Sequence, residues 1–130
     1  MAKSRGLAEI AMSVPPGTLT DDFCADVLDF YGGLLEWTEI EALRAPDQFT
    51  LHVGRRTFLN LRERADSMTY HGYEHVGVLV ETAEIAESLW EQLAADPRDL
   101  GLEPMERAGD ARTFRFRYRL PMAIEVQFIP

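Results

Sequence analysis

The first half of the chain alternates apolar and polar positions in a way that predicts a strand followed by a helix. Residues 8–14 (AEIAMSV) alternate with a period of two, which is typical of a strand with one buried face. Thr20 precedes two aspartates and predicts a helix start, because its hydroxyl can cap the helix and carboxylates favour its N-terminus. Apolar residues then recur at helical spacing, and Gly32-Gly33 is a place where this helix can end.

Three short apolar runs follow the helix and predict three strands separated by turns. They are residues 37–43 (WTEIEAL), 49–53 (FTLHV) and 57–63 (TFLNLRE). The tripeptides at 45–47 and 54–56 contain proline, aspartate or glycine and predict the two turns. The first half therefore has the order βαβββ, and the polar residues 65–72 are a linker.

The second half repeats this order, which predicts an internal duplication. Residues 75–80, 103–109, 112–120 and 122–130 are strand-like, and Thr82 can cap a helix with apolar positions Ile85, Leu89 and Leu93. Aligning the first strands pairs Glu9 with His75, a shift of 66, and aligning the last strands pairs Asn60 with Glu125, a shift of 65. We therefore expect one domain of two modules, about residues 7–64 and 73–130.

Composition and charge restrict the class of partner. The chain has 130 residues, 46% of them hydrophobic and 27% charged, and its net charge is −9. This excess of negative charge opposes binding to nucleic acid or to an anionic membrane surface. The apolar runs are far shorter than the roughly 20 residues that cross a bilayer. The single cysteine and the absence of a signal-like start favour a cytoplasmic protein, with a small molecule as its partner.

The order of these segments resembles the vicinal oxygen chelate superfamily, which includes glyoxalase I, extradiol dioxygenases and bleomycin-resistance proteins. The resemblance covers about residues 7–129 and is carried by DVLDFYGGLLEW (26–37), EHVGVLV (74–80) and IEVQF (124–128). It implies an α+β fold in which two βαβββ modules form one cupped mixed sheet with helices on the outside. It also implies a homodimer.

The resemblance further implies a divalent metal site on the first and last strands of each module. The matching positions are His75, Glu125, Glu9 and Asn60. His75 and Glu125 would be ligands, Glu9 a third ligand or a general base, and Glu125 a catalytic residue as well. Imidazole and carboxylate ligands suit Fe²⁺, Mn²⁺, Zn²⁺ or Ni²⁺. The implied activity is that of a lyase, isomerase or dioxygenase, although glutamate at position 9 disfavours ring cleavage, which calls for a second histidine.

Three readings of these residues stay open. In the first they hold a metal, and in the second they line a metal-free binding cup like that of drug-sequestering resistance proteins. In the third their role is structural, with Glu125 or Glu9 paired to an arginine, and the protein is a ligand sensor or a subunit without catalysis. Alternation in residues 112–120 places aromatic residues on one face and Arg115, Arg117 and Arg119 on the other. An arginine there can bind a carboxylate or phosphate of a substrate. The candidate substrate contacts are Asn60, His52, Arg115 and Arg117.

Overall fold

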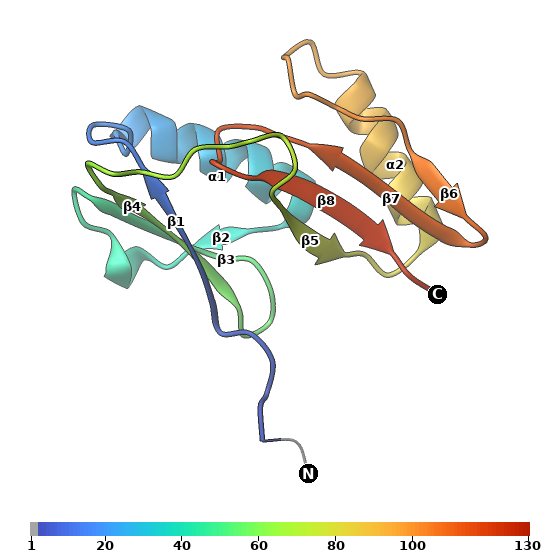
Figure 1. Ribbon diagram of the computed structural model, residues 1–130, viewed down its shortest axis with the longest axis horizontal. Helices are drawn as coiled ribbons and strands as arrows, with labels where there is room; N and C mark the ends of the chain where they lie inside the picture. Colours follow the sequence, from blue (N-terminus) through green and yellow to red (C-terminus); the bar gives the residue numbers. More distant parts are fainter. Residues whose placement is uncertain (1–2) are drawn as a thin grey trace. The chain divides into compact units, whose positions relative to one another are not determined.

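The computed structural model describes residues 3–130 and divides the chain into two compact units (Figure 1). The first unit ends at Thr69 and the second begins at Tyr70, inside the predicted linker. Each unit contains one βαβββ module, so the predicted α+β fold of two modules is confirmed. Among residues 3–130, no helix has the length and apolar character needed to cross a membrane.

The first module forms a four-stranded mixed sheet in the order β1-β4-β3-β2. Strand β1 is parallel to β4, and the other neighbours are antiparallel. Its elements are β1 (Glu9–Val14), α1 (Asp21–Leu35), β2 (Thr38–Glu39), the 3₁₀ helix η1 (Glu41–Leu43), β3 (Gln48–His52) and β4 (Phe58–Glu63).

The second module repeats the topology with the strand order β5-β8-β7-β6. Strand β5 is parallel to β8, and β7 is antiparallel to both β8 and β6. Its elements are β5 (His75–Leu79), α2 (Ala83–Ala94), β6 (Glu106–Ala108), β7 (Ala111–Phe116) and β8 (Ala123–Phe128). Hydrogen bonds thus join the strands as two sheets of four, one in each module.

Both predicted helix caps are present. The Thr20 hydroxyl accepts the N–H of Phe23, and the Thr82 hydroxyl accepts the N–H of Ile85 in the same way. Helix α1 does not end at Gly32-Gly33 but continues to Leu35. The next residue, Glu36, takes the left-handed conformation (φ 61°), and its N–H returns to the Gly32 carbonyl.

The strand predicted at residues 37–43 is wrong beyond Glu39. Only Thr38 and Glu39 pair with β3, and the chain then turns into η1. The Glu39 carboxylate binds the Arg44 guanidinium with an Nε–Oε2 distance of 2.6 Å, which closes this turn. An ion pair between residues five apart thus accompanies the turn that ends the strand.

The strand predicted at residues 112–120 also ends early, at Phe116. The N–H of Leu120 donates to the Tyr118 carbonyl at 2.6 Å, and between them Arg119 has a φ of 61°, so the chain makes a tight turn. Arg98 lies over the ring of Tyr118 in this turn, 4.8 Å from its centroid.

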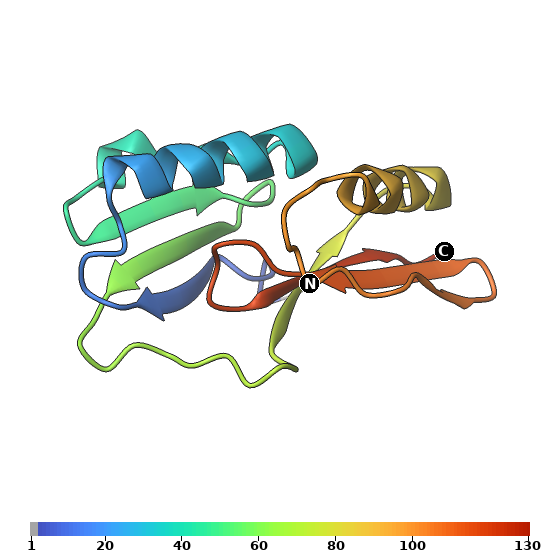
Figure 2. The ribbon, with the colours of Figure 1, turned by 90° about the horizontal axis from the view of Figure 1, so that it is seen from above.

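In each module the helix covers one face of its own sheet (Figure 2). The buried strand residues on that face are Met12, Val14, Phe49, Leu51, Leu59 and Leu61 in the first module and Phe114, Phe116, Ile124 and Val126 in the second. Helix α2 buries Ala86 and Leu93 but leaves Ile85 42% exposed, so its buried face is rotated from the predicted one. The single cysteine, Cys24, is fully buried in α1, and burial raises the pKa of its thiol.

Candidate functional site

The strand ladders place the predicted site residues at equivalent positions of the two modules. In the first module Ala11 of β1 lies opposite Asn60 of β4, and in the second Gly77 of β5 lies opposite Glu125 of β8. These pairs differ by 77 − 11 = 66 and 125 − 60 = 65, the shifts that the sequence alignment predicted. Glu9 and His75 begin the equivalent strands β1 and β5.

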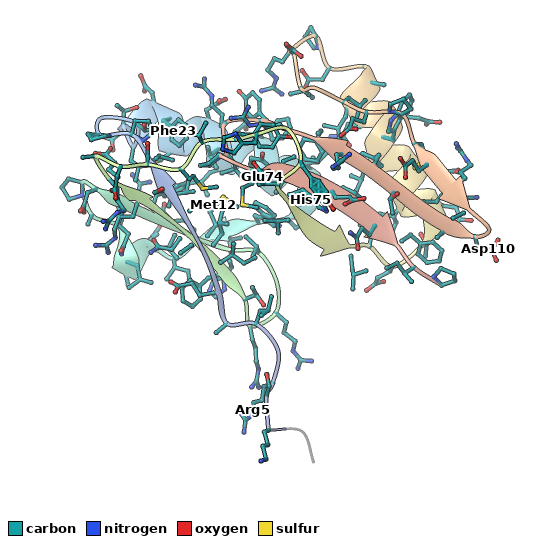
Figure 3. All side chains as sticks on the ribbon, viewed as in Figure 1. Arg5, Met12, Phe23, Glu74, His75 and Asp110 are labelled. Carbon is teal, nitrogen blue, oxygen red and sulfur yellow. The ribbon has the colours of Figure 1, made fainter. Side chains whose placement is uncertain are left out.

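The second module brings His75 and Glu125 into direct contact. The distance from His75 Nε2 to Glu125 Oε2 is 2.7 Å, and these side chains are only 23% and 18% exposed. Figure 3 labels His75 at the start of β5. The other ring nitrogen, Nδ1, lies 2.8 Å from the Tyr73 carbonyl oxygen. A carbonyl only accepts, so Nδ1 carries a proton in this arrangement. Nε2 and the Glu125 carboxylate oxygen lie side by side at the distance of an N–H···O hydrogen bond.

Small residues on the same sheet face make room for this pair. Gly77 follows His75 by two positions and therefore shares its face. A Cβ atom at Gly77 would lie 2.8 Å from Nε2 of Gln127, so only glycine lets the Gln127 amide lie against β5. Ala123, directly opposite His75, is also small. The sequence thus places small residues beside the polar pair, with the Gln127 amide packed over Gly77, and packs the other face tightly.

Arg115 lies directly opposite Glu125 but forms its ion pair elsewhere. Its Nε is 2.9 Å from Oε2 of Glu103, and its Nη2 is 3.2 Å from Oε1 of the same carboxylate. Partial burial alone would lower the pKa of the Arg115 guanidinium, but the Glu103 carboxylate outweighs that effect and raises it. Glu103 thus balances the charge of Arg115 and leaves Glu125 with His75 as its partner.

These groups line one open pocket of about 270 Å³ in the second module. The Tyr73 ring meets the His75 ring edge to face at 5.4 Å between centroids, and Arg115 lies 5.8 Å from the Tyr73 centroid. The lining residues are Tyr73, His75, Glu103, Pro104, Glu106, Thr113, Phe114, Arg115 and Glu125. Sequence reasoning did not select Tyr73 or Glu103. Tyr73 precedes the strand predicted at 75–80, and Glu103 begins the strand-like stretch 103–109, where no alternation marks it as a site residue.

The other predicted site residues lie apart from this pocket or in the first module. Arg117 lines a different pocket of the second module. In the first module, Asn60 Oδ1 accepts a hydrogen bond of 3.2 Å from the Thr50 hydroxyl, while Glu9 and His52 are exposed. The roles predicted for Glu9, Asn60 and His52 therefore stay predictions.

Solved structures of other proteins share the fold of this chain. The chain matches no protein-family model and no curated protein sequence. A possible glyoxalase from Bacillus cereus has a similar structure, with a TM-score of 0.70 and 19% identity over 95% of this chain and 98% of that one. A glyoxalase/bleomycin resistance protein/dioxygenase from Nocardioides has a TM-score of 0.66 and 16% identity over 98% and 85%. This is the vicinal oxygen chelate fold.

A fosfomycin resistance protein, FosX from Listeria monocytogenes, shares the vicinal oxygen chelate fold and was solved with Mn(II) and sulfate. Its TM-score is 0.70, with 16% identity over 98% of this chain and 92% of that one. Identities this low establish the fold alone, so any shared chemistry must be argued from the residues of this chain.

The residues of the second module fit part of a divalent metal site of the vicinal oxygen chelate type. One imidazole nitrogen and one carboxylate oxygen are a suitable donor pair for Fe²⁺, Mn²⁺, Zn²⁺ or Ni²⁺. The hydrogen bond from His75 Nδ1 to a backbone carbonyl is the outer contact that orients a ligating histidine. Within either unit, the described residues contain no cluster of three His, Cys, Asp or Glu side chains arranged to bind a metal. His75 and Glu125 would therefore supply two ligands to such a site.

Proposed function

We propose that this protein binds a small molecule with neighbouring oxygen atoms through a divalent metal ion and acts on it as a lyase, isomerase or dioxygenase. The observation that carries this proposal is the 2.7 Å contact of His75 Nε2 with Glu125 Oε2, because it places an imidazole nitrogen and a carboxylate oxygen side by side as metal donors. FosX, which shares the fold, was solved with Mn(II). The metal ion, when bound, would polarise an oxygen of the ligand and stabilise the negative charge that develops there.

The residues around this pair orient the ligand and keep the donors in place. The Tyr73 carbonyl fixes the His75 tautomer that presents Nε2, and the carboxylate of Glu125 supplies negative charge. The Tyr73 ring packs against the imidazole and shields it on one side. Arg115 and Glu103 are held together at the opposite wall, where they offer a donor and an acceptor to polar groups of the ligand.

Metal binding to single-residue variants tests the proposal. We expect about one Mn²⁺ per chain in equilibrium dialysis of the parent protein, and loss of that ion in both His75→Ala and Glu125→Ala. Matched controls are His71→Ala and Glu91→Gln, which change an exposed histidine and an exposed glutamate outside the pocket. The same measurement on Glu9→Gln tests the role predicted for Glu9. A parent protein that binds none of Fe²⁺, Mn²⁺, Zn²⁺ and Ni²⁺ would contradict the proposal.

A metal-free binding protein is the second candidate. The same contact favours it, since a proton between His75 and Glu125 satisfies both lone pairs as a metal ion does. In that case small polar ligands would bind the pocket and raise the melting temperature equally with and without a chelator. Under the metal-dependent proposal, the chelator abolishes the ligand-induced shift.

A further inference from the structure

A second pocket of the second module, of about 350 Å³, contains two arginines that the proposed function does not use. It is lined by Tyr70, Asp99, Gly101, Arg117, Arg119 and Leu120. None of these residues lines the pocket of His75 and Glu125. The arginines come from the turn that interrupts the predicted strand after Phe116. The early end of β7 therefore brings both guanidinium groups to one concave surface.

The Arg117 side chain is held in place without an ion pair. Its guanidinium carbon lies 4.3 Å from the centroid of the Tyr70 ring, and its Nε donates to the Leu120 carbonyl at 3.3 Å. Among residues 3–130, no carboxylate lies within ion-pair distance of Arg117, whereas Arg115 has Glu103 and Arg112 has Glu87. One face of the Arg117 guanidinium plane packs on Tyr70, and its Nε bonds to a carbonyl. The two terminal Nη groups remain as a pair of donors for a ligand.

Arg119 reaches the same pocket through an unfavourable backbone conformation. Its φ of 61° lies in the left-handed region, which is unfavourable for a residue with a Cβ atom. The N–H of Leu120 bonds to the Tyr118 carbonyl across this residue and maintains the turn. Glycine would remove the cost, so the arginine side chain at this position calls for a function.

We propose that Arg117 and Arg119 form a binding site for an oxyanion, the carboxylate or phosphate group of a small molecule. Two guanidinium groups match the planar edge of a carboxylate or two oxygens of a phosphate. In a chain of net charge −9, two arginines at one pocket create a local positive field that attracts an anion. The Tyr70 ring and Leu120 add an apolar wall, so the site suits an anion attached to an apolar group.

Asp99 gives this site a carboxylate that opposes the ligand. Its Oδ1 accepts the N–H of Gly101 at 3.2 Å, which directs part of its charge to the backbone. The remaining negative charge weakens anion binding by simple repulsion. Removal of that charge should therefore strengthen the site, an effect that a merely structural role of the turn does not produce.

The test is calorimetric titration of phenyl phosphate and of benzoate into the full chain, with a chelator present to exclude metal-dependent binding. We expect one of the two probes to bind the parent, and Arg117→Gln and Arg119→Gln each to weaken it about tenfold, as for the loss of one charged hydrogen bond. Asp99→Asn should bind more tightly than the parent. Tyr70→Phe should bind as the parent does, and Tyr70→Leu more weakly.

The matched control is Arg55→Gln, which removes an exposed arginine from a turn of the first module and should leave the affinity unchanged. Binding of phenyl phosphate alone assigns the site to a phosphate, and binding of benzoate alone assigns it to a carboxylate. The proposal is overturned if neither probe binds at millimolar concentration. It is also overturned if Arg117→Gln, still folded by circular dichroism, binds as tightly as the parent. Because metal is absent throughout, failure here leaves the His75 and Glu125 proposal untouched.

Discussion

The two modules carry different side chains at the same ladder positions. In the first module Thr50 lies opposite Asn60, and in the second Arg115 lies opposite Glu125. Thr50 and Asn60 bond to each other and complete a neutral pair. Arg115 turns to Glu103, and Glu125 turns to His75. The same backbone therefore supports a closed polar pair in one module and an open charged site in the other.

The opposite face of each sheet does not vary in this way. Leu51 pairs with Leu59 in the first module, and Phe116 pairs with Ile124 at the equivalent positions of the second. All four are buried. The face against the helix thus maintains the fold with apolar residues, and the other face is where the modules differ in chemistry. The proposed function therefore rests on residues of the second module.

The largest expected effect tests the claim that the buried faces are equivalent. Phe116→Ala and Leu51→Ala each leave a cavity in a fully buried position, so we expect losses of about 3–5 and about 2–5 kcal/mol in the free energy of unfolding. Urea unfolding measures both. A loss under about 1 kcal/mol in only one of them would show that the modules do not rely on their cores equally.

A smaller effect tests the contrast between the polar faces. Thr50 is 1% exposed and its hydroxyl bonds to Asn60, so Thr50→Val should cost about 1 kcal/mol by leaving that amide oxygen without its donor. Arg115→Gln at the equivalent position should cost under about 0.5 kcal/mol, because it breaks an ion pair that solvent reaches. The reverse order in urea unfolding would contradict the contrast.

The helix caps test a feature that both modules share. Thr20 and Thr82 each accept one N–H of the first helical turn at 3.1 Å. Thr20→Ala and Thr82→Ala should each cost about 1 kcal/mol, and the serine variants should recover most of it. Differential scanning calorimetry compares the four. Equal stability of the alanine and serine variants at either position would show that the hydroxyl there does not stabilise the helix.

The smallest effect is a pH dependence of the second module. The Arg98 side chain, and then its backbone N–H, lower the pKa of Asp96 from 3.8 to about 2. A lowered carboxylate pKa stabilises the fold above the unfolded value, and this contribution is lost as the pH falls through the folded one. Between about pH 4 and 2 the melting temperature of the parent should therefore fall more steeply than that of Asp96→Asn.

The control for this pH dependence is Asp110→Asn, at the exposed tip of the β6–β7 hairpin that Figure 3 labels. Its melting temperature should follow the parent curve between about pH 4 and 2. Parallel curves for the parent and Asp96→Asn would show that the ion pair of Asp96 with Arg98 does not contribute.

Much of this fold follows from local sequence patterns. Thr20 and Thr82 predicted both helix starts, and the shifts of 66 and 65 residues predicted the ladder that brings His75 beside Glu125. These features depend on capping and on strand alternation, which neighbouring residues determine. Because the chain is duplicated, the equivalence of its strands also predicts contacts between residues that are far apart in the sequence.

The features that the sequence did not predict depend on contacts between distant segments. Alternation continues to Tyr118, but the stacking of Arg98 on that ring accompanies the end of β7 at Phe116. Glu103 became part of the site only because its carboxylate reaches Arg115 from outside the strands. No periodicity within one segment encodes such pairs, so the second arginine pocket and the walls of the candidate site had to come from the structure.

The most direct test of the central claim is the state of the two ring nitrogens of His75, measured by long-range nitrogen–proton NMR with and without Zn²⁺. The account predicts a protonated Nδ1, held by the Tyr73 carbonyl, and a large Zn²⁺-induced shift of the Nε2 resonance that disappears in Glu125→Ala. A shift at Nδ1 instead, or His75 signals unchanged by the metal, would contradict the claim that the second module presents His75 and Glu125 as a metal-binding pair.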